Sequence, residues 1–182
     1  AWFGVILKDW DDIIAQVMPM FHVYGNIGSC ATAIVGHNPL VLVPDPRDLK
    51  DLMATIRKVK PAFLPGVPTL FIALLNRPEV KAGKVDFRPV KLCIAGAAPL
   101  LAETKREFEA LTGGRMVEGY ALTESMMAAV VCPIQGKYKV GSVGLPVTDV
   151  EVRIADAETG QGSPNGAITT PPMSRNTMSA GF

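Results

Sequence analysis

Short apolar runs alternate with helical patterns along the first two thirds of the chain. The first run, from Leu40 to Val43, lies between two prolines and predicts a buried strand. Beyond it, apolar residues recur at steps of three and four, which is typical of one face of an amphipathic helix. These residues are Leu49, Leu52, Met53, Ile56 and Val59. Asp48 is expected to cap this helix, and Pro61 to follow its end.

Two more strand–helix units follow. Residues 62–64 predict a strand and residues 70–75 a short helix. Residues 90–95 predict another strand, followed by a helix over 101–111 that stops at Gly113. Repetition of this kind predicts an α/β fold, with a mostly parallel sheet flanked by helices and right-handed crossovers.

The pattern changes toward the C-terminus. Residues 150–154 alternate between apolar and polar types, so we expect an additional, half-exposed strand beyond the parallel core. From about Thr159 the chain is rich in Gly, Ser, Pro, Asn and Thr without a period. We therefore expect one domain over residues 1–159 and an irregular tail over 160–182.

The composition excludes some classes of partner and site. Lys and Arg number 18 against 17 Asp and Glu, and no basic run is interleaved with aromatics, so we expect no nucleic-acid partner. The hydrophobic fraction of 48% indicates an exposed apolar surface or an internal apolar tunnel, and leaves peripheral membrane association open. Cys30, Cys93 and Cys132 are widely spaced, which argues against disulfides or zinc and favours the cytoplasm. Oligomeric state is not indicated.

The run from Gly119 to Glu124 predicts the most specific chemistry. A small-residue turn there combines an aromatic ring (Tyr120), a hydroxyl (Thr123) and a carboxylate (Glu124). These groups suit a purine, a phosphate and a phosphate-bound Mg²⁺, in that order. The Mg²⁺ is required because Glu124 would repel the phosphates of ATP unless a cation lay between them. The alternative is a strand–turn–helix junction with Glu124 at the start of the helix.

Two other segments have both a functional and a structural interpretation. Gly96, Ala97, Ala98 and Pro99 follow the third predicted strand, where a ligand could approach the backbone at the carboxyl end of a parallel sheet. The alternative there is a tight turn that needs small residues for packing. His22 lies between aromatic residues, and is either a binding or catalytic group or a core histidine.

Five motifs in order give the chain a resemblance to a known family. The sequence resembles the adenylate-forming acyl-CoA synthetase (AMP-binding enzyme) superfamily, and within it bacterial fatty acyl-CoA ligases. The likeness covers about residues 15–160. Its motifs are Pro19-x-Phe21-His22-x-x-Gly25, Gly66-Val67-Pro68-Thr69, Gly96-Ala97-Ala98-Pro99-Leu100, Gly119-Tyr120-Ala121-Leu122-Thr123-Glu124 and Gly141-Ser142-Val143-Gly144-x-Pro146.

The resemblance implies a two-step reaction. A carboxylate attacks the α-phosphate of ATP to give an acyl-adenylate and release pyrophosphate, and the thiol of CoA then displaces AMP. Thr123, Glu124 and His22 would be the catalytic residues, with Glu124 on Mg²⁺. The remaining implied contacts divide between nucleotide and acyl substrate. Gly96, Ala97, Ala98, Pro99, Gly119, Tyr120 and Thr123 would bind the nucleotide, and His22, Gly25, Gly66 and Val67 would lie near the acyl group.

The resemblance also identifies what the chain lacks. The family's phosphate-binding loop would precede Ala1, and its ribose-binding Thr-Gly-Asp and small C-terminal domain would follow the tail. We therefore expect the central part of the large N-terminal domain of a fatty acid–CoA ligase, inactive by itself. The alternatives are a ligase for aromatic or short-chain acids and a non-catalytic module that binds nucleotide or acyl groups.

Overall fold

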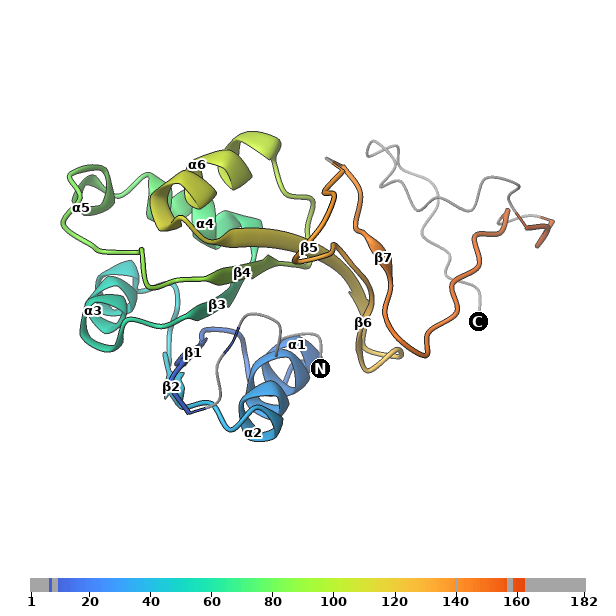
Figure 1. Cartoon of the computed structure of the whole chain (residues 1–182), viewed down its shortest axis with the longest axis horizontal. Helices are drawn as coiled ribbons and strands as arrows, with labels where there is room; N and C mark the ends of the chain where they lie inside the picture. Colours follow the sequence, from blue (N-terminus) through green and yellow to red (C-terminus); the bar gives the residue numbers. More distant parts are fainter. Residues whose placement is uncertain (1–6, 8–9, 140, 157–158, 163–182) are drawn as a thin grey trace.

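The described residues build a seven-stranded sheet with helices packed on it (Figure 1). The computed structural model describes residues 7, 10–139, 141–156 and 159–162. The strand order is β2-β1-β3-β4-β5-β6-β7. The strands are β1 (Ile14–Gln16), β2 (Leu40–Leu42), β3 (Phe63–Gly66), β4 (Leu92–Ala95), β5 (Arg115–Leu122), β6 (Met127–Val131) and β7 (Leu145–Pro146).

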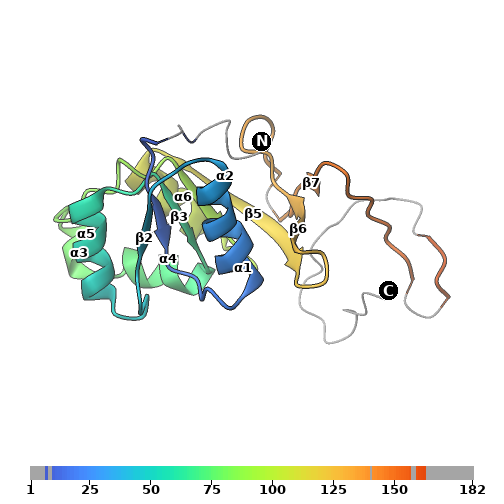
Figure 2. The same ribbon diagram turned by 90° about the horizontal axis from the view of Figure 1, so that it is seen from below.

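Helices cover both faces of the parallel part, which runs from β2 to β5 (Figures 1 and 2). Side chains along β4 alternate between the two faces. Leu92 and Ile94 belong to one core cluster, with Tyr24 and Ala33, whereas Cys93 belongs to the other. The helices are α1 (Val23–Gly25), η2 (Asn26–Ala31), α2 (Thr32–Val35), α3 (Leu49–Val59), α4 (Pro68–Leu75), α5 (Pro78–Lys81) and α6 (Ala102–Thr112).

The helices α3 and α6 begin and end where the sequence predicts. Asp48 caps α3 by accepting hydrogen bonds from the amides of Lys50 and Asp51, at 3.0 and 3.2 Å. The helix α6 ends at Gly113, which adopts the left-handed conformation (φ 71°) that glycine accepts without strain. The α/β fold with a mostly parallel sheet is thus confirmed.

The helical segment from Val23 to Val35 was not predicted as a helix. It combines α1, the π-helix η2 and α2, and packs on the sheet face opposite α4 and α6 (Figure 2). Gly25 permits this packing, because a Cβ there would lie only 2.2 Å from the carbonyl oxygen of Pro19. Two glycines in a short apolar run obscure the helical pattern, since glycine is a poor helix former.

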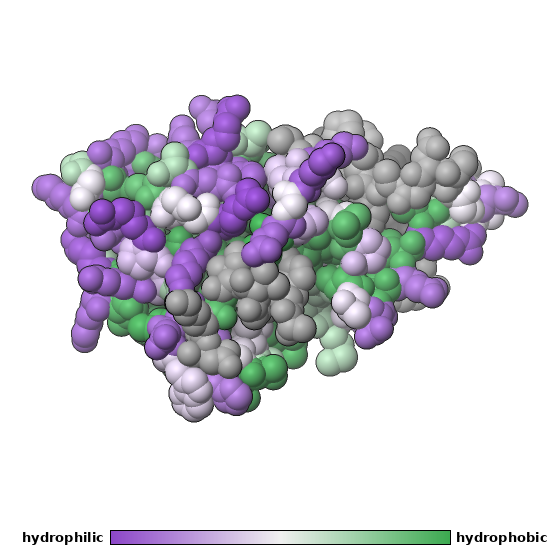
Figure 3. Space-filling model, in the orientation of Figure 1, coloured by the Kyte–Doolittle hydropathy of each residue, from purple (hydrophilic) through white to green (hydrophobic). Residues whose placement is uncertain are grey.

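The sheet continues past β5 with antiparallel strands. β5 pairs with β6, with a shift of register between Tyr120 and Ala121, and β6 pairs with β7. In Figure 3 polar side chains are dense over the helical layer, and hydrophobic ones are also visible on the side of β6 and β7. No helix in the described part of the chain is long and apolar enough to span a bilayer.

Two predicted strands differ from the structure. The strand from Leu40 is β2, an edge strand that pairs with β1 alone and is half-buried to exposed rather than buried. The predicted strand at 150–154 is not formed, and only an isolated bridge joins Ala155 to Gly162 nearby. The free edge of β6 is already paired with β7, so residues 150–154 have no partner strand there despite their alternating pattern. Most of the predicted tail, residues 163–182, lies outside the described residues.

Candidate functional site

A cavity of about 510 Å³ lies at the carboxyl ends of the central strands, between β4, β5 and the first helical segment. Most of its lining is apolar, and its polar side chains are those of His22, Thr123 and Glu124, with the hydroxyl of Tyr24. This is the place in an open parallel sheet where ligands commonly bind. The apolar lining includes Val23, Ile27, Ile94, Ala121, Leu122, Met126, Met127, Ala128, Val131 and Val147.

The cavity brings half of the predicted site residues together. Those that line it are His22, Gly96, Ala97, Gly119, Thr123 and Glu124. Those that lie outside its lining are Gly25, Gly66, Val67, Ala98, Pro99 and Tyr120. Residues that are neighbours in the sequence fall into different groups. The geometry of a strand or turn directs their side chains to different sides, so only some of them face the cavity.

His22 caps the first helical segment at the edge of the cavity. Its Nδ1 accepts a hydrogen bond of 3.1 Å from the amide of Tyr24, and the residue is exposed. Because Nδ1 is an acceptor, the proton of the neutral ring lies on Nε2, which is left to interact with a ligand. The alternative of a core histidine is therefore wrong.

Tyr24 forms the floor of the cavity and was missed by the sequence analysis. Its hydroxyl donates to the carbonyl of Ile94 at 2.8 Å and accepts from the amide of Gly66 at 3.2 Å. It therefore joins the helical segment to the ends of β3 and β4. Burial raises the pKa of Tyr24 above its ordinary value of 10.0, so the hydroxyl stays protonated at neutral pH. The only signal in the sequence was its place between His22 and Gly25.

The ends of β3 and β4 explain several small residues in the motifs. Gly66 is buried, and a Cβ there would lie 2.8 Å from the ring of Phe71. A Cβ on Gly96 would lie 3.3 Å from the ring of Tyr24, so glycine lets the tyrosine lie against the strand end. The next residue, Ala97, has a positive φ of 67°, which marks a tight turn. These contacts support the packing interpretation of this segment, and the ligand interpretation stays a prediction.

The motif from Gly119 to Glu124 is a strand and a hairpin turn. β5 continues to Leu122, and the turn that follows leads into β6 rather than into a helix. The strand–turn–helix alternative is therefore wrong, and so is the expectation of a turn at Gly119 itself. Ser125 fixes the turn, because its hydroxyl donates to the carbonyl of Leu122 and accepts from the amide of the same residue. Thr123 and Glu124 are exposed on this turn.

Tyr120 points away from the cavity. Gly119 and Ala121 line the cavity, whereas Tyr120, between them, packs against a separate cluster that includes Val130 and Val143. Alternation along a strand produces this division. A ligand on the Tyr120 ring would thus lie on the other side of β5 from the cavity.

Met127 narrows the cavity opposite the helical segment. A Cβ on Gly28 would lie 2.9 Å from the Cε of Met127, so the two residues are in close contact. Met127 also has a positive φ of 117°, an uncommon conformation for a residue with a side chain. Met126 and Met127 both line the cavity.

The donor groups at the site suit a cation held jointly with a ligand. Within the described residues there is no group of three or more His, Cys, Asp or Glu that could hold a metal ion by itself. Glu124 and the adjacent Thr123 provide oxygen donors at the cavity. Mg²⁺ commonly binds through one or two carboxylates together with the phosphate oxygens of a substrate, so these residues fit it.

Comparisons with known proteins give matches over most of the chain. The family described as AMP-binding enzyme matches residues 2–168. The long-chain-fatty-acid–CoA ligase of Bacillus subtilis is 36% identical over 166 residues, which are 88% of this chain and 28% of that protein. The chain thus spans less than a third of the length of this relative.

Solved structures show the same arrangement of elements. The ATP-bound structure of MatB from Rhodopseudomonas palustris has a TM-score of 0.72 at 30% identity, and the match covers 90% of this chain and 31% of MatB. A benzoate CoA ligase from Burkholderia xenovorans has a TM-score of 0.77 at 21% identity, covering 91% of this chain and 34% of the ligase. The second match shows the fold alone.

Proposed function

The chain belongs to the AMP-binding enzyme family, and on that premise we propose that the whole protein is a fatty acid–CoA ligase. It would use ATP and Mg²⁺ to convert a fatty acid to an acyl-adenylate, and then transfer the acyl group to CoA. The observation that carries the proposal is the apolar cavity of about 510 Å³, whose lining includes the polar side chains of His22, Thr123 and Glu124. The B. subtilis relative, a long-chain-fatty-acid–CoA ligase by name, supports the same substrate class.

We assign the acyl chain to the cavity. Its lining is mostly apolar, and burial of methylene groups contributes about 0.8 kcal/mol each. His22 would lie near the carboxylate and the thiol, because its Nε2 is free of the hydrogen bond that Nδ1 makes to Tyr24. Gly25 and Gly66 would act on the acyl site indirectly, because Gly25 lets the first helical segment lie against Pro19 and Gly66 leaves room for the ring of Phe71. Val67 would support them by packing on the adjacent core.

The nucleotide belongs beside the cavity rather than in it. Ala98, Pro99 and Tyr120 lie outside the cavity, while Gly96, Ala97 and Gly119 form its wall. A purine on the Tyr120 side of β5 would leave the α-phosphate near the turn that carries Thr123 and Glu124. Thr123 would contact that phosphate, and Glu124 would hold Mg²⁺ bound to the phosphate oxygens. The ATP-bound state of MatB supports a nucleotide in this fold.

Catalysis would then rest on positioning and charge neutralisation. The cavity would hold the carboxylate in line with the α-phosphate, and Mg²⁺ would supply a positive charge for the negative charge that develops there. The exposed position of Thr123 and Glu124 leaves both side chains accessible to substrate.

The test is ATP–pyrophosphate exchange by the full-length protein with a panel of fatty, aromatic and short-chain acids. We expect exchange with fatty acids, and none from the 182-residue chain by itself. Glu124→Ala should lower kcat/KM about a hundredfold, as for loss of one transition-state contact. Glu107→Ala, an exposed carboxylate on α6, is the matched control and should leave the rate unchanged.

Three outcomes would contradict the proposal. Exchange with aromatic or short-chain acids alone would replace the substrate class. Saturable binding of Mg-ATP without exchange would indicate a non-catalytic module. Unchanged kinetics of Glu124→Ala at limiting Mg²⁺ would reject the role of Glu124.

A further inference from the structure

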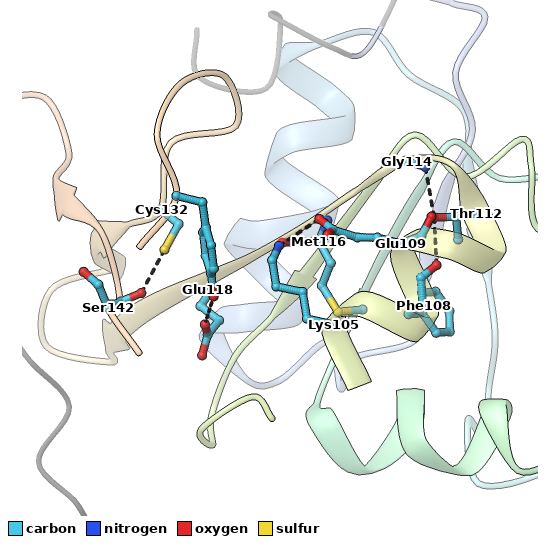
Figure 4. A network of polar contacts seen from close by, with 10 residues as sticks. Lys105, Phe108, Glu109, Thr112, Gly114, Met116, Glu118, Cys132 and Ser142 are labelled. Carbon is cyan, nitrogen blue, oxygen red and sulfur yellow. Dashed lines mark hydrogen bonds and ion pairs between the residues drawn. The ribbon is translucent and has the colours of Figure 1, made fainter. Parts of the chain in front are cut away.

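The carboxylate of Glu118, in the middle of β5, connects two loops. The residue is 8% exposed, and its two oxygens accept from different segments. Oε1 accepts from the amide of Leu100 at 3.2 Å, and Oε2 accepts from the hydroxyl of Tyr138 at 2.5 Å. Figure 4 shows Glu118 on β5, close to the segment that carries Cys132.

The ring of Tyr138 is held from a second side. The Nζ of Lys105 lies 4.2 Å from the centre of this ring, in a cation–π contact. Lys105 is itself fixed, because its ammonium pairs with Glu109 at 2.8 Å and donates to the carbonyl of Met116. Glu109 also accepts from the amide of Met116 at 2.9 Å, as the network in Figure 4 shows. Tyr138 therefore cannot shift without disturbing a buried network.

Tyr138 keeps its proton under ordinary conditions. Burial, followed by the hydrogen bond to Glu118, raises its pKa above the ordinary value of 10.0. A hydroxyl that donates to a carboxylate makes a charge-assisted hydrogen bond, which is shorter and stronger than one between neutral groups. The contact at 2.5 Å is of this kind.

Glu118 lies between the two segments that form the walls of the candidate site. On one side, Leu100 directly follows the loop of residues 96–99, of which Gly96 and Ala97 line the cavity. On the other side, Gly119 directly follows Glu118 and also lines the cavity. The carboxylate thus holds the 96–99 loop at a fixed position relative to β5.

We propose that Tyr138 is a positioning residue for the nucleotide, acting through Glu118 on the 96–99 loop. It touches no substrate. By holding the Glu118 carboxylate against the amide of Leu100, it sets the separation between the two segments to which we assign the purine. This inference rests on the proposed function for its consequence in catalysis, whereas the connection itself is a property of the fold.

The first experiment measures the connection without activity. Hydrogen exchange of the peptide that contains Leu100 is followed in the full-length protein for the wild type, Tyr138→Phe and Lys137→Ala. The phenylalanine keeps the ring on Lys105 and removes the hydroxyl alone. We expect about tenfold faster exchange at Leu100 in Tyr138→Phe. Lys137→Ala, an exposed neighbour in the same loop, should match the wild type.

The second experiment measures the consequence for the nucleotide. For Tyr138→Phe we expect the KM for ATP to rise about tenfold, with the KM for the acid within about twofold and the melting temperature nearly unchanged. A tenfold change equals about 1.4 kcal/mol, within the range for one hydrogen bond to a charged group. Glu118→Gln, with Tyr138 intact, can still accept from Leu100 and donate to Tyr138, so it should raise the KM for ATP far less than Tyr138→Phe does.

The outcomes separate this inference from the proposed function. Unchanged exchange at Leu100 in Tyr138→Phe overturns it, whatever the enzyme activity. Equal increases in both KM values with a lower melting temperature also overturn it, since they indicate a structural role alone. If the wild type shows no ATP–pyrophosphate exchange, the proposed function fails, and the Leu100 exchange still decides the connection.

Discussion

Replacing Tyr24 with phenylalanine tests whether the floor of the cavity holds the strand ends together. The change removes one oxygen and keeps the ring, which lies close to Gly96. It deprives the carbonyl of Ile94 of a donor at 2.8 Å, and the amide of Gly66 of an acceptor at 3.2 Å. Tyr24 is 9% exposed, so water has poor access to both groups.

The loss in the free energy of unfolding should be large for the removal of a single oxygen atom. A hydrogen bond contributes about 1 kcal/mol net, and a buried polar group left without a partner costs about 1–3 kcal/mol. With two backbone groups affected, we expect the free energy of unfolding to fall by about 2–4 kcal/mol. A typical domain has only about 5–15 kcal/mol in total, so the variant should be clearly less stable.

Urea unfolding of the 182-residue chain, followed by circular dichroism, measures this difference. The slope of the free energy of unfolding against urea concentration should not change. The ring still fills its place, so the area exposed on unfolding is the same. Tyr120→Phe is the matched control, since its hydroxyl has no hydrogen bond to another residue among those described, and should change stability by less than about 0.5 kcal/mol. A loss in Tyr24→Phe no larger than in Tyr120→Phe would refute the reasoning.

Two further predictions concern the helix cap and pH. Asp48→Ala should lower the free energy of unfolding by about 1 kcal/mol, because the amides of Lys50 and Asp51 lose their acceptor; Asp51→Ala is a control within the same turn, and equal losses would contradict the capping role. The pKa values of Tyr24 and Tyr138 are raised in the folded state above the ordinary value of 10.0. Both tyrosines therefore contribute fully to the free energy of unfolding below pH 10, and this contribution is lost as the pH rises above 10. Phenolate absorbance at 295 nm should therefore show these two tyrosines ionising above pH 10, and titration of both at their ordinary pKa would contradict the burial.

The sequence predicted elements whose signals are local. The helix α3 has its cap, its apolar face and its end within a dozen residues, and α6 ends at a glycine with positive φ. The β3 and β4 strands are short apolar runs followed by small residues, as expected for central strands of a parallel sheet. In each case the residues that decide the structure are neighbours in the chain.

Elements that depend on distant partners were missed. Small residues around Gly119 indicate a turn, but pairing with β6 keeps this segment in a strand as far as Leu122. The alternation at 150–154 indicates which residues share a face, although it cannot show whether a sheet edge is free to pair with them. The helical segment from Val23 is stabilised by packing on the sheet, which overrides the low helix propensity of its glycines.

The candidate site divides in the same way. Its motif residues His22, Thr123 and Glu124 could be identified from the sequence, and they are exposed on loop or turn positions. The residues that fix the positions of those loops are buried and reach across the fold. Tyr24 joins residues 42 and 70 positions away, and Glu118 joins loops 18 and 20 positions away on either side.

Variants of the exposed site residues and of the buried positioning residues should differ in how much activity and how much stability they lose. An exposed residue such as Glu124 contributes little to packing, so its loss should change chemistry and leave the free energy of unfolding nearly unchanged. Tyr24 makes its contacts within the protein, so its loss should lower stability and disturb the cavity together. Tyr138 stands between these cases, because its hydroxyl stabilises one loop connection and its ring keeps the rest of the network. If the three variants showed the same ratio of lost activity to lost stability, the separation between positioning residues and site residues would not hold.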